Sequence, residues 1–341
     1  MFQKMKHGLK IQLKGCFMKK NSHILYWLLT ILIVMTALNT CIRQSVCTTL
    51  AEWEVGKAFV FRMNDVIDEV QKRLGEEYEV KRVEVMKNND TKLKGIQVRR
   101  KDMNVAKICY WTSESVDEIV AVINRSLFPK FDCEINLEKL KDRIVYTLVN
   151  ANSNKSRLKT IPYRMLEGTD LAITYKLIID IDFNATASSD VTNALMEHLK
   201  VTENDLYTFA TKNTQKLYAP SIMSLTDIVS KTDNQSQEDV SNTPETIFVL
   251  TNFKKHFGAS CIVYPDVLKN FCKEKNMDGV YMIPSSVHEF LLLVMDKEYV
   301  NCGYVKQMIK EANRESLEKE DVLSDNLYYY NAVNDAVSIV E

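Results

Sequence analysis

The feature that most constrains the fold is the segment Thr246–Tyr330, in which short apolar runs and helical stripes alternate at close spacing. Short β-prone runs bounded by turn residues predict strands, whereas apolar residues recurring every three or four positions predict helices. The expected order is strands Ile247–Leu250 and Ser260–Tyr264, helix Asp266–Lys275, strands Gly279–Ile283 and Glu289–Met295, helix Gly303–Glu315 and strand Asn326–Tyr330. Two successive β-β-α units predict an α+β fold, with helices packed on one face of a mixed or antiparallel sheet.

The sequence between Met63 and this segment predicts a further lobe of the same class. The cleanest strand is Leu171–Ile181, where apolar residues alternate without a slip, which predicts one buried face. Apolar residues from Leu137 to Leu148 have helical spacing and predict a helix. The expected organisation is an N-terminal extension at 1–62, an α/β lobe at 63–151, a central strand with helices at 152–230, a polar loop at 231–244 and a C-terminal β-β-α-β-β-α-β lobe at 245–335.

The N-terminal extension contains an apolar run at 24–42 that is preceded by six lysines. A membrane-spanning helix needs about 20 apolar residues, so this run is near the lower limit. Three interpretations stay open. The run is a signal anchor of a single-pass membrane protein, or part of a signal peptide that starts at Met18. Alternatively, translation starts at Met63 and the protein is cytoplasmic.

Composition and the missing motifs disfavour several classes of function. Lys and Arg number 44 against 45 Asp and Glu, so no overall basic field favours nucleic acid. The eight cysteines form no C-x-x-C pair, and we expect no metal site. Phosphate-loop, dinucleotide-binding, zinc-protease and nucleophile-elbow motifs are absent from the sequence, so we expect no cofactor.

The only string with chemical variety is Ser285-Ser286-Val287-His288-Glu289, at the junction of two predicted strands. A serine, a histidine and a carboxylate can act as nucleophile, base and orienting group. Ser286 and His288 share one face of a strand and Glu289 takes the other, so a more distant carboxylate such as Asp325 or Asp170 would have to complete a triad. The alternative interpretation is a turn in which the serines satisfy local backbone groups.

Other polar residues lie at predicted turns and are candidates for contact with a ligand or partner. Asn252 and His256 lie in a loop that ends at Gly258, where Asn252 is expected to bond its own backbone. Ser324 and Asp325 precede the last predicted strand. The candidate catalytic residues are therefore His288, Ser286, Ser285 and Asp325, and the candidate binding residues are Asn252, His256, Glu289 and Ser324.

Several separate strings resemble one bacterial family, domain of unknown function 5688, which occurs in Firmicutes. The strings are NNDTKLKG from Asn88, IPYRMLEGTDLAITY from Ile161, TNFKKHFGASCIVYPDVL from Thr251, MIPSSVHEFLLL from Met282 and VLSDNLYYY from Val322. They occur in the family's order, and the resemblance covers about residues 63–331. It implies no catalytic residue, cofactor or substrate that can be assigned to this chain.

The sequence therefore favours a non-catalytic interaction or regulatory module over an enzyme. The alternative is a hydrolase-like enzyme that uses Ser285 or Ser286 with His288. The expected partner is a protein or a small molecule, with a membrane contact through residues 24–42 if they are translated.

Overall fold

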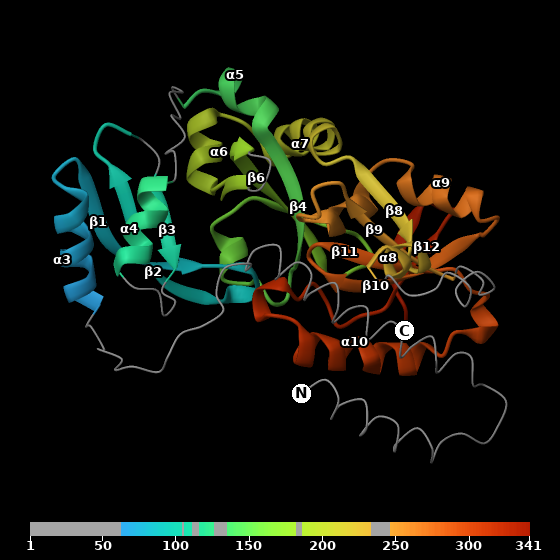
Figure 1. The fold of residues 1–341 in the computed structure, drawn as a ribbon. Coiled ribbons are helices and arrows are strands. Elements are labelled where there is room, and N and C mark those ends of the chain that lie inside the picture. Colours follow the sequence, from blue (N-terminus) through green and yellow to red (C-terminus); the bar gives the residue numbers. More distant parts are fainter. Residues whose placement is uncertain (1–62, 104–105, 111–115, 126–134, 182–185, 233–245) are drawn as a thin grey trace, which may run out of the picture. The chain divides into compact units, whose positions relative to one another are not determined.

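The computed structural model describes residues 63–103, 106–110, 116–125, 135–181, 186–232 and 246–341. Over these ranges helices accompany three antiparallel sheets (Figure 1), so the predicted α+β class is confirmed. The hydrophobic segment at 24–42 lies outside the described residues. Among the residues that are described, no helix has both the length and the apolar character needed to cross a membrane.

The first sheet contains β1 (Tyr78–Met86), β2 (Lys92–Arg100) and β3 (Ala106–Tyr110). Helices α3 (Met63–Leu74) and α4 (Val116–Arg125) contribute to its core, which consists of Val66, Val70, Leu74, Ile96, Val98, Ile119 and Ile123. The β1–β2 turn contains the short 3-10 helix η1 (Asn88–Asp90), where Asn89 and Asp90 have φ of 57° and 49°. Asn and Asp tolerate this left-handed conformation better than most residues.

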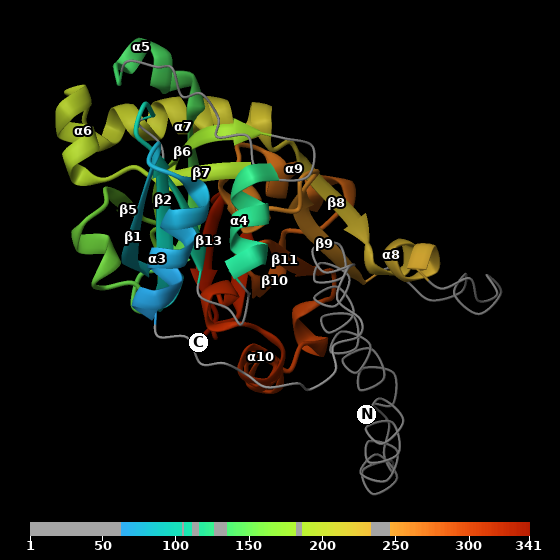
Figure 2. The ribbon, with the colours of Figure 1, turned by 60° about the vertical axis from the view of Figure 1, so that its left-hand side comes forward.

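The second sheet pairs β4 (Ile144–Asn150), β6 (Leu171–Ile181) and β5 (Tyr163–Met165), with β7 (Thr186–Asp190) also on β6. Strand β6 has the predicted bounds, but its burial differs from the prediction: Ala172 and Thr174 are as buried as Ile173 and Tyr175. Helix α6 (Asn193–Leu199) is followed by α7 (Glu203–Leu217), which packs along β4 and β6 (Figure 2).

The prediction of one helix from Leu137 to Leu148 is wrong. Helix α5 stops at Leu140 (Leu137–Leu140), the 3-10 turn η2 (Lys141–Arg143) follows, and β4 then begins. Every residue of β4 is buried, and it pairs with β6 from Ile144↔Leu177 to Asn150↔Leu171. Ladder hydrogen bonds and burial of β-branched residues therefore outweigh the helical spacing of the leucines.

The third sheet has six strands in the order β13 (Ala336–Ile339), β12 (Tyr328–Asn331), β10 (Gly279–Ser286), β11 (Glu289–Leu293), β9 (Ile247–Asn252) and β8 (Pro220–Ser224). Helix α8 (Leu225–Thr232) follows β8. The strands on the two sides of the predicted polar loop, β8 and β9, pair with each other. The proposed domain boundaries stay predictions.

The predicted strand Ser260–Tyr264 is wrong, because residues 260–263 belong to the 3-10 helix η4 (Gly258–Val263) and Tyr264 caps its end. A Cβ on Gly258 would lie 2.3 Å from Oγ1 of Thr251 and 2.4 Å from the carbonyl oxygen of His288. Only glycine permits the chain to pass this close to β9 and the β10–β11 turn. The close passage leaves η4 buried beside β9 instead of extended in the sheet.

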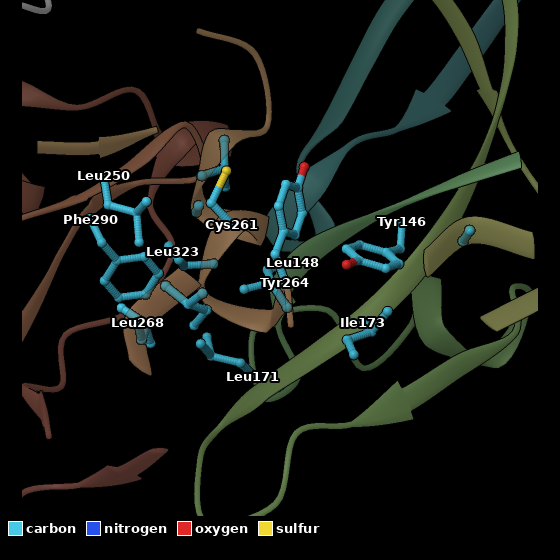
Figure 3. Packing of buried hydrophobic residues seen from close by; sticks show 14 of the residues in the cluster. Tyr146, Leu148, Leu171, Ile173, Leu250, Cys261, Tyr264, Leu268, Phe290 and Leu323 are labelled. Carbon is cyan, nitrogen blue, oxygen red and sulfur yellow. The ribbon is translucent and has the colours of Figure 1, made fainter. Parts of the chain in front are cut away.

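Both faces of the central strands of this sheet are buried. Val280, Met282, Phe290 and Leu292 belong to the main hydrophobic core together with α9 (Val267–Glu274). The same core includes Tyr146, Leu148, Leu171 and Ile173 from the second sheet (Figure 3). Tyr281 and Ile283, on the other face of β10, are also buried, and α10 (Cys302–Ser316) packs against β10. Helical cover therefore extends to the second face of the sheet.

Candidate functional site

The string from Ser285 to Glu289 forms the tight turn between β10 and β11. Ser286 pairs with Glu289 across the turn, and the register shifts between Pro284 and Ser286. Oγ of Ser286 accepts a hydrogen bond from the backbone N–H of His288 at 3.0 Å. The backbone N–H of Val287 donates to the carbonyl of Asp321 at 2.9 Å. The side chain of Ser286 thus satisfies local backbone, which is the turn interpretation of this string.

Ser285 and Glu289 form a buried polar pair behind the turn. Oγ of Ser285 donates to Oε1 of Glu289 at 3.0 Å, and both residues are buried. Burial raises the pKa of the Glu289 carboxyl, while the bond from Ser285 and the nearby His288 oppose that rise. The hydroxyl of Ser285 is therefore engaged with a carboxylate rather than with an imidazole.

The ring of His288 is held by groups outside its own turn. Nδ1 accepts a hydrogen bond from the backbone N–H of Phe257 at 3.1 Å. Nε2 lies 3.6 Å from Oδ1 of Asp321, the last residue of the 3-10 helix η6 (Lys319–Asp321). Since Nδ1 is an acceptor, the neutral ring carries its proton on Nε2 and directs it towards Asp321. Within the described structure, neither serine hydroxyl is hydrogen-bonded to this ring.

Asn252 shapes the loop that follows β9. Its Oδ1 accepts from the backbone N–H of Lys254 at 3.0 Å, and its Nδ2 donates to the carbonyl of His256 at 2.8 Å. This is the backbone-bonding role expected for Asn252. The turn leaves the ring of Phe253 76% exposed, beside the exposed Lys254 and Lys255.

His256 lies against two other rings. Its ring centroid is 3.9 Å from that of Phe257 and 5.5 Å from that of His288. Burial lowers the pKa of His256 to about 4, with smaller contributions from the neighbouring His288 and from the charge of Lys176. His256 is therefore a neutral ring at pH 7, and His256 and His288, both singled out in the sequence, do meet in space.

Ser324 belongs to a different cluster, centred on Asp170. Oδ2 of Asp170 accepts from Oγ of Ser324 at 3.0 Å, from Nδ2 of Asn150 at 2.6 Å and from Nδ2 of Asn326 at 3.1 Å. Its Oδ1 accepts from the hydroxyl of Tyr328. Burial and the charge of Asp170 raise the pKa of that tyrosine. This carboxylate joins the second sheet to the start of β12.

Asp325 supports the same turn. Its Oδ1 accepts from Nδ2 of Asn313 on α10 at 2.8 Å, and the same amide donates to the carbonyl of Ser324 at 2.9 Å. No hydrogen bond in the described structure joins Asp325 or Asp170 to His288. The two clusters therefore bring together His288 with His256, and Ser324 with Asp170, but not all the candidates at one point.

The β1–β2 turn is a third polar cluster, and the sequence did not reveal its contacts. Nδ2 of Asn89 donates to the carbonyls of Lys319 and Val322, each at 2.7 Å. Its backbone N–H donates to Oδ1 of Asn154 at 2.9 Å, and both asparagines are buried. The turn thereby holds η6, the segment that carries Asp321. The adjacent pair Asn88-Asn89 was visible in the sequence, but its hydrogen-bond partners lie far away along the chain.

A buried ion cluster also escaped the sequence analysis. Arg157, in the 3-10 helix η3 (Arg157–Lys159), donates from Nη2 to both carboxylate oxygens of Asp190 at 2.8 Å. Nζ of Lys176 on β6 donates to Oδ1 of the same carboxylate at 2.7 Å and lies 5.2 Å from the ring centroid of Phe257. Burial lowers the pKa of Lys176, and Arg157 adds to that effect. The only sequence signal was a lysine inside a strongly apolar strand.

No group of three or more potential metal ligands occurs among the described residues. The profile of one family, described as a family of unknown function (DUF5688), matches residues 61–332. The chain belongs to this family. The match contains all five strings quoted above and every described element from α3 to β12, whereas β13 lies beyond it. No curated protein and no solved structure matches the chain.

Proposed function

We propose that this member of the DUF5688 family is a non-catalytic interaction module that contacts a protein partner through the turn Phe253–Lys255. The observation that supports this proposal is the contrast between the hydrogen-bonded side chains around His288 and the exposed ring of Phe253. The side chains that could perform chemistry are engaged in shaping two turns, while an aromatic ring next to them is left in solvent.

Phe253 has the properties of an interface anchor. Its side chain is 76% exposed, although the side chain of Asn252 makes three hydrogen bonds with the backbone of the turn beneath it. Its backbone N–H donates to the carbonyl of Ala219 at 3.1 Å, which adds a tie to the start of β8. A rigid aromatic side chain loses little conformational freedom on binding and buries a large apolar area, which is why such residues dominate interface energies.

Two features oppose the hydrolase-like alternative. A base must be within hydrogen-bond reach of the hydroxyl that it activates, and Nδ1 of His288 already accepts the backbone N–H of Phe257. Ser285 donates to a buried carboxyl group instead. Turnover of any ester, amide or phosphoester substrate that is lost in His288→Asn but kept in Phe253→Ser would contradict the proposal.

The direct test is site-specific photo-crosslinking in cells that make the protein. A benzoyl-phenylalanine at position 253 should give a discrete crosslinked species. The same residue at Val333, which is 83% exposed on another turn, is the matched control and should give none. Excess unlabelled wild-type protein should suppress the product, and excess Phe253→Ser protein should not.

Equal crosslinking at both positions, or a product that Phe253→Ser suppresses as well as wild type, would contradict the proposal. The net charge of −1 is the reason for placing a protein rather than nucleic acid at this turn. A bacterial source and an anchor at residues 24–42 remain expectations from the sequence.

A further inference from the structure

The buried ion cluster holds two cations and one carboxylate. Arg157 is 6% exposed, and the side chain of Lys176 is 15% exposed. Both donate to Oδ1 of Asp190, so the two positive groups are close neighbours. Two like charges away from water, with one counter-charge between them, are costly because their repulsion is poorly screened.

Arg157 has donors that this carboxylate does not use. Its Nε and Nη2 contact Asp190, whereas Nη1 is buried and has no hydrogen-bond partner among the residues that the structure describes. In a planar guanidinium the N–H bonds of Nη1 point away from the edge formed by Nε and Nη2. A buried donor without a partner costs about 1–3 kcal/mol unless another group pairs with it. An acceptor is therefore expected on the far side of Arg157 from Asp190.

The surroundings add further positive charge to this position. Lys87, at the start of the β1–β2 turn, is close enough to Lys176 to influence its ionisation. Asp90 is a second carboxylate that interacts with Arg157, but its oxygens accept the backbone N–H groups of Ser156 and Arg157, at 2.9 and 3.0 Å. Among the described residues, these two carboxylates thus leave Nη1 of Arg157 without a hydrogen bond.

We propose that Arg157 and Lys176 form the cationic side of a binding site for a small oxyanion of the phosphate class, with Nη1 of Arg157 as a direct donor. A guanidinium fork beside an ammonium point charge is the pairing that recognises tetrahedral oxyanions, because the fork supplies direction and the lysine supplies charge. Two of the family's quoted strings reach the cluster, through the ring of Phe257, 5.2 Å from Nζ of Lys176, and through Asp90, which accepts the backbone N–H of Arg157. This site is independent of the Phe253 surface.

The test measures the thermal stability of the full chain with inorganic phosphate, with glycerol phosphate and with sodium chloride at equal ionic strength. A bound anion stabilises the native state by mass action, so phosphate should raise Tm by a few degrees in a saturable way. A response to glycerol phosphate alone would assign the site to the phosphate group of a larger ligand, and a response to inorganic phosphate alone would assign it to the free anion.

Two variants assign the effect to the cluster. Arg157→Lys keeps a positive charge beside Asp190 but removes Nη1, and it should lose most of the rise in Tm. Arg164→Lys is the matched control, because Arg164 also contacts a carboxylate through Nε and Nη2, at Glu203, and it should keep the full rise. If Arg157→Lys does not fold, Lys176→Gln is the second test, with the loss of ³¹P line broadening as its readout. A wild-type protein that responds equally to phosphate and chloride, or a full response in Arg157→Lys or Lys176→Gln, overturns the proposal.

Discussion

The backbone N–H of Phe257 donates to Nδ1 of His288 at 3.1 Å, across 31 positions of sequence. This bond sets the tautomer of the imidazole and fastens the 252–258 loop to the β10–β11 turn. It also accounts for the presence of histidine without assigning it chemistry.

Two substitutions of His288 distinguish the contribution of its Nδ1 acceptor from the contribution of its ring. In His288→Asn, Oδ1 can take the place of Nδ1, and we expect stability within about 1 kcal/mol of wild type. In His288→Phe the ring stacking is kept but the N–H of Phe257 is left unpaired, which should cost about 1–3 kcal/mol. Urea denaturation of the two variants measures the difference. Equal stability of both would show that this hydrogen bond does not hold the loop.

His256 should make the protein sensitive to mild acid. Its pKa falls from 6.5 to about 4 in the native state, so between these values the unfolded chain binds more protons and stability decreases as the pH falls. The full loss at pH 4 is about 3 kcal/mol or less. Between pH 7 and pH 4, the denaturation midpoint should depend less steeply on pH in His256→Phe, which keeps the stacked ring, than in wild type. His198→Gln, at an exposed histidine, should keep the wild-type slope.

Glu289→Gln should stabilise the protein at neutral pH. Because burial raises the pKa of this carboxyl, the native state binds more protons than the unfolded state above pH 4.5, and the glutamate costs stability as the pH rises. Glutamine keeps an oxygen that accepts from Ser285 and carries no charge, so we expect a gain of about 1 kcal/mol at pH 7.

The gain in Glu289→Gln should vanish near pH 3, where both states of the wild-type carboxyl are protonated. Glu203→Gln is the contrasting variant. Because Glu203 pairs with Arg164, this substitution should destabilise the protein. A gain in Glu289→Gln that persists at low pH would contradict the assigned cause.

Asn89 combines a left-handed backbone with three hydrogen bonds from or to its side chain. Asn89→Gly tolerates φ of 57° but removes the donors to the carbonyls of Lys319 and Val322, and should cost about 2–4 kcal/mol. Asn89→Ala should cost more, because alanine also strains the backbone. Urea denaturation of the two variants measures both losses of stability. An order in which alanine is the better tolerated residue would show that the turn does not depend on this conformation.

Local patterns predicted much of the fold. The alternation of Leu171–Ile181 predicted β6 with its observed bounds. The same reasoning failed where neighbours decided the outcome. Strand β4 follows its pairing with β6 instead of its helical spacing, and η4 is shaped by the close passage of Gly258.

The candidate site divides in the same way. The sequence located the turn at Ser285–Glu289 and the backbone-bonding role of Asn252, because each is satisfied within a few residues of the chain. It did not indicate that Arg157, Lys176 and Asp190 meet, because no period or motif joins three charges that lie on separate elements.

By itself, the sequence determined the α+β class, most element positions and the turns whose hydrogen bonds are local. Only the tertiary structure decided which nitrogen of His288 accepts a hydrogen bond, that the face of β6 with Lys176 is buried, and which guanidinium nitrogen has no hydrogen-bond partner among the described residues. The physical reason is range. Backbone geometry and side-chain spacing act over a few residues, whereas burial and ionic contacts depend on groups that the folded chain brings together from distant positions.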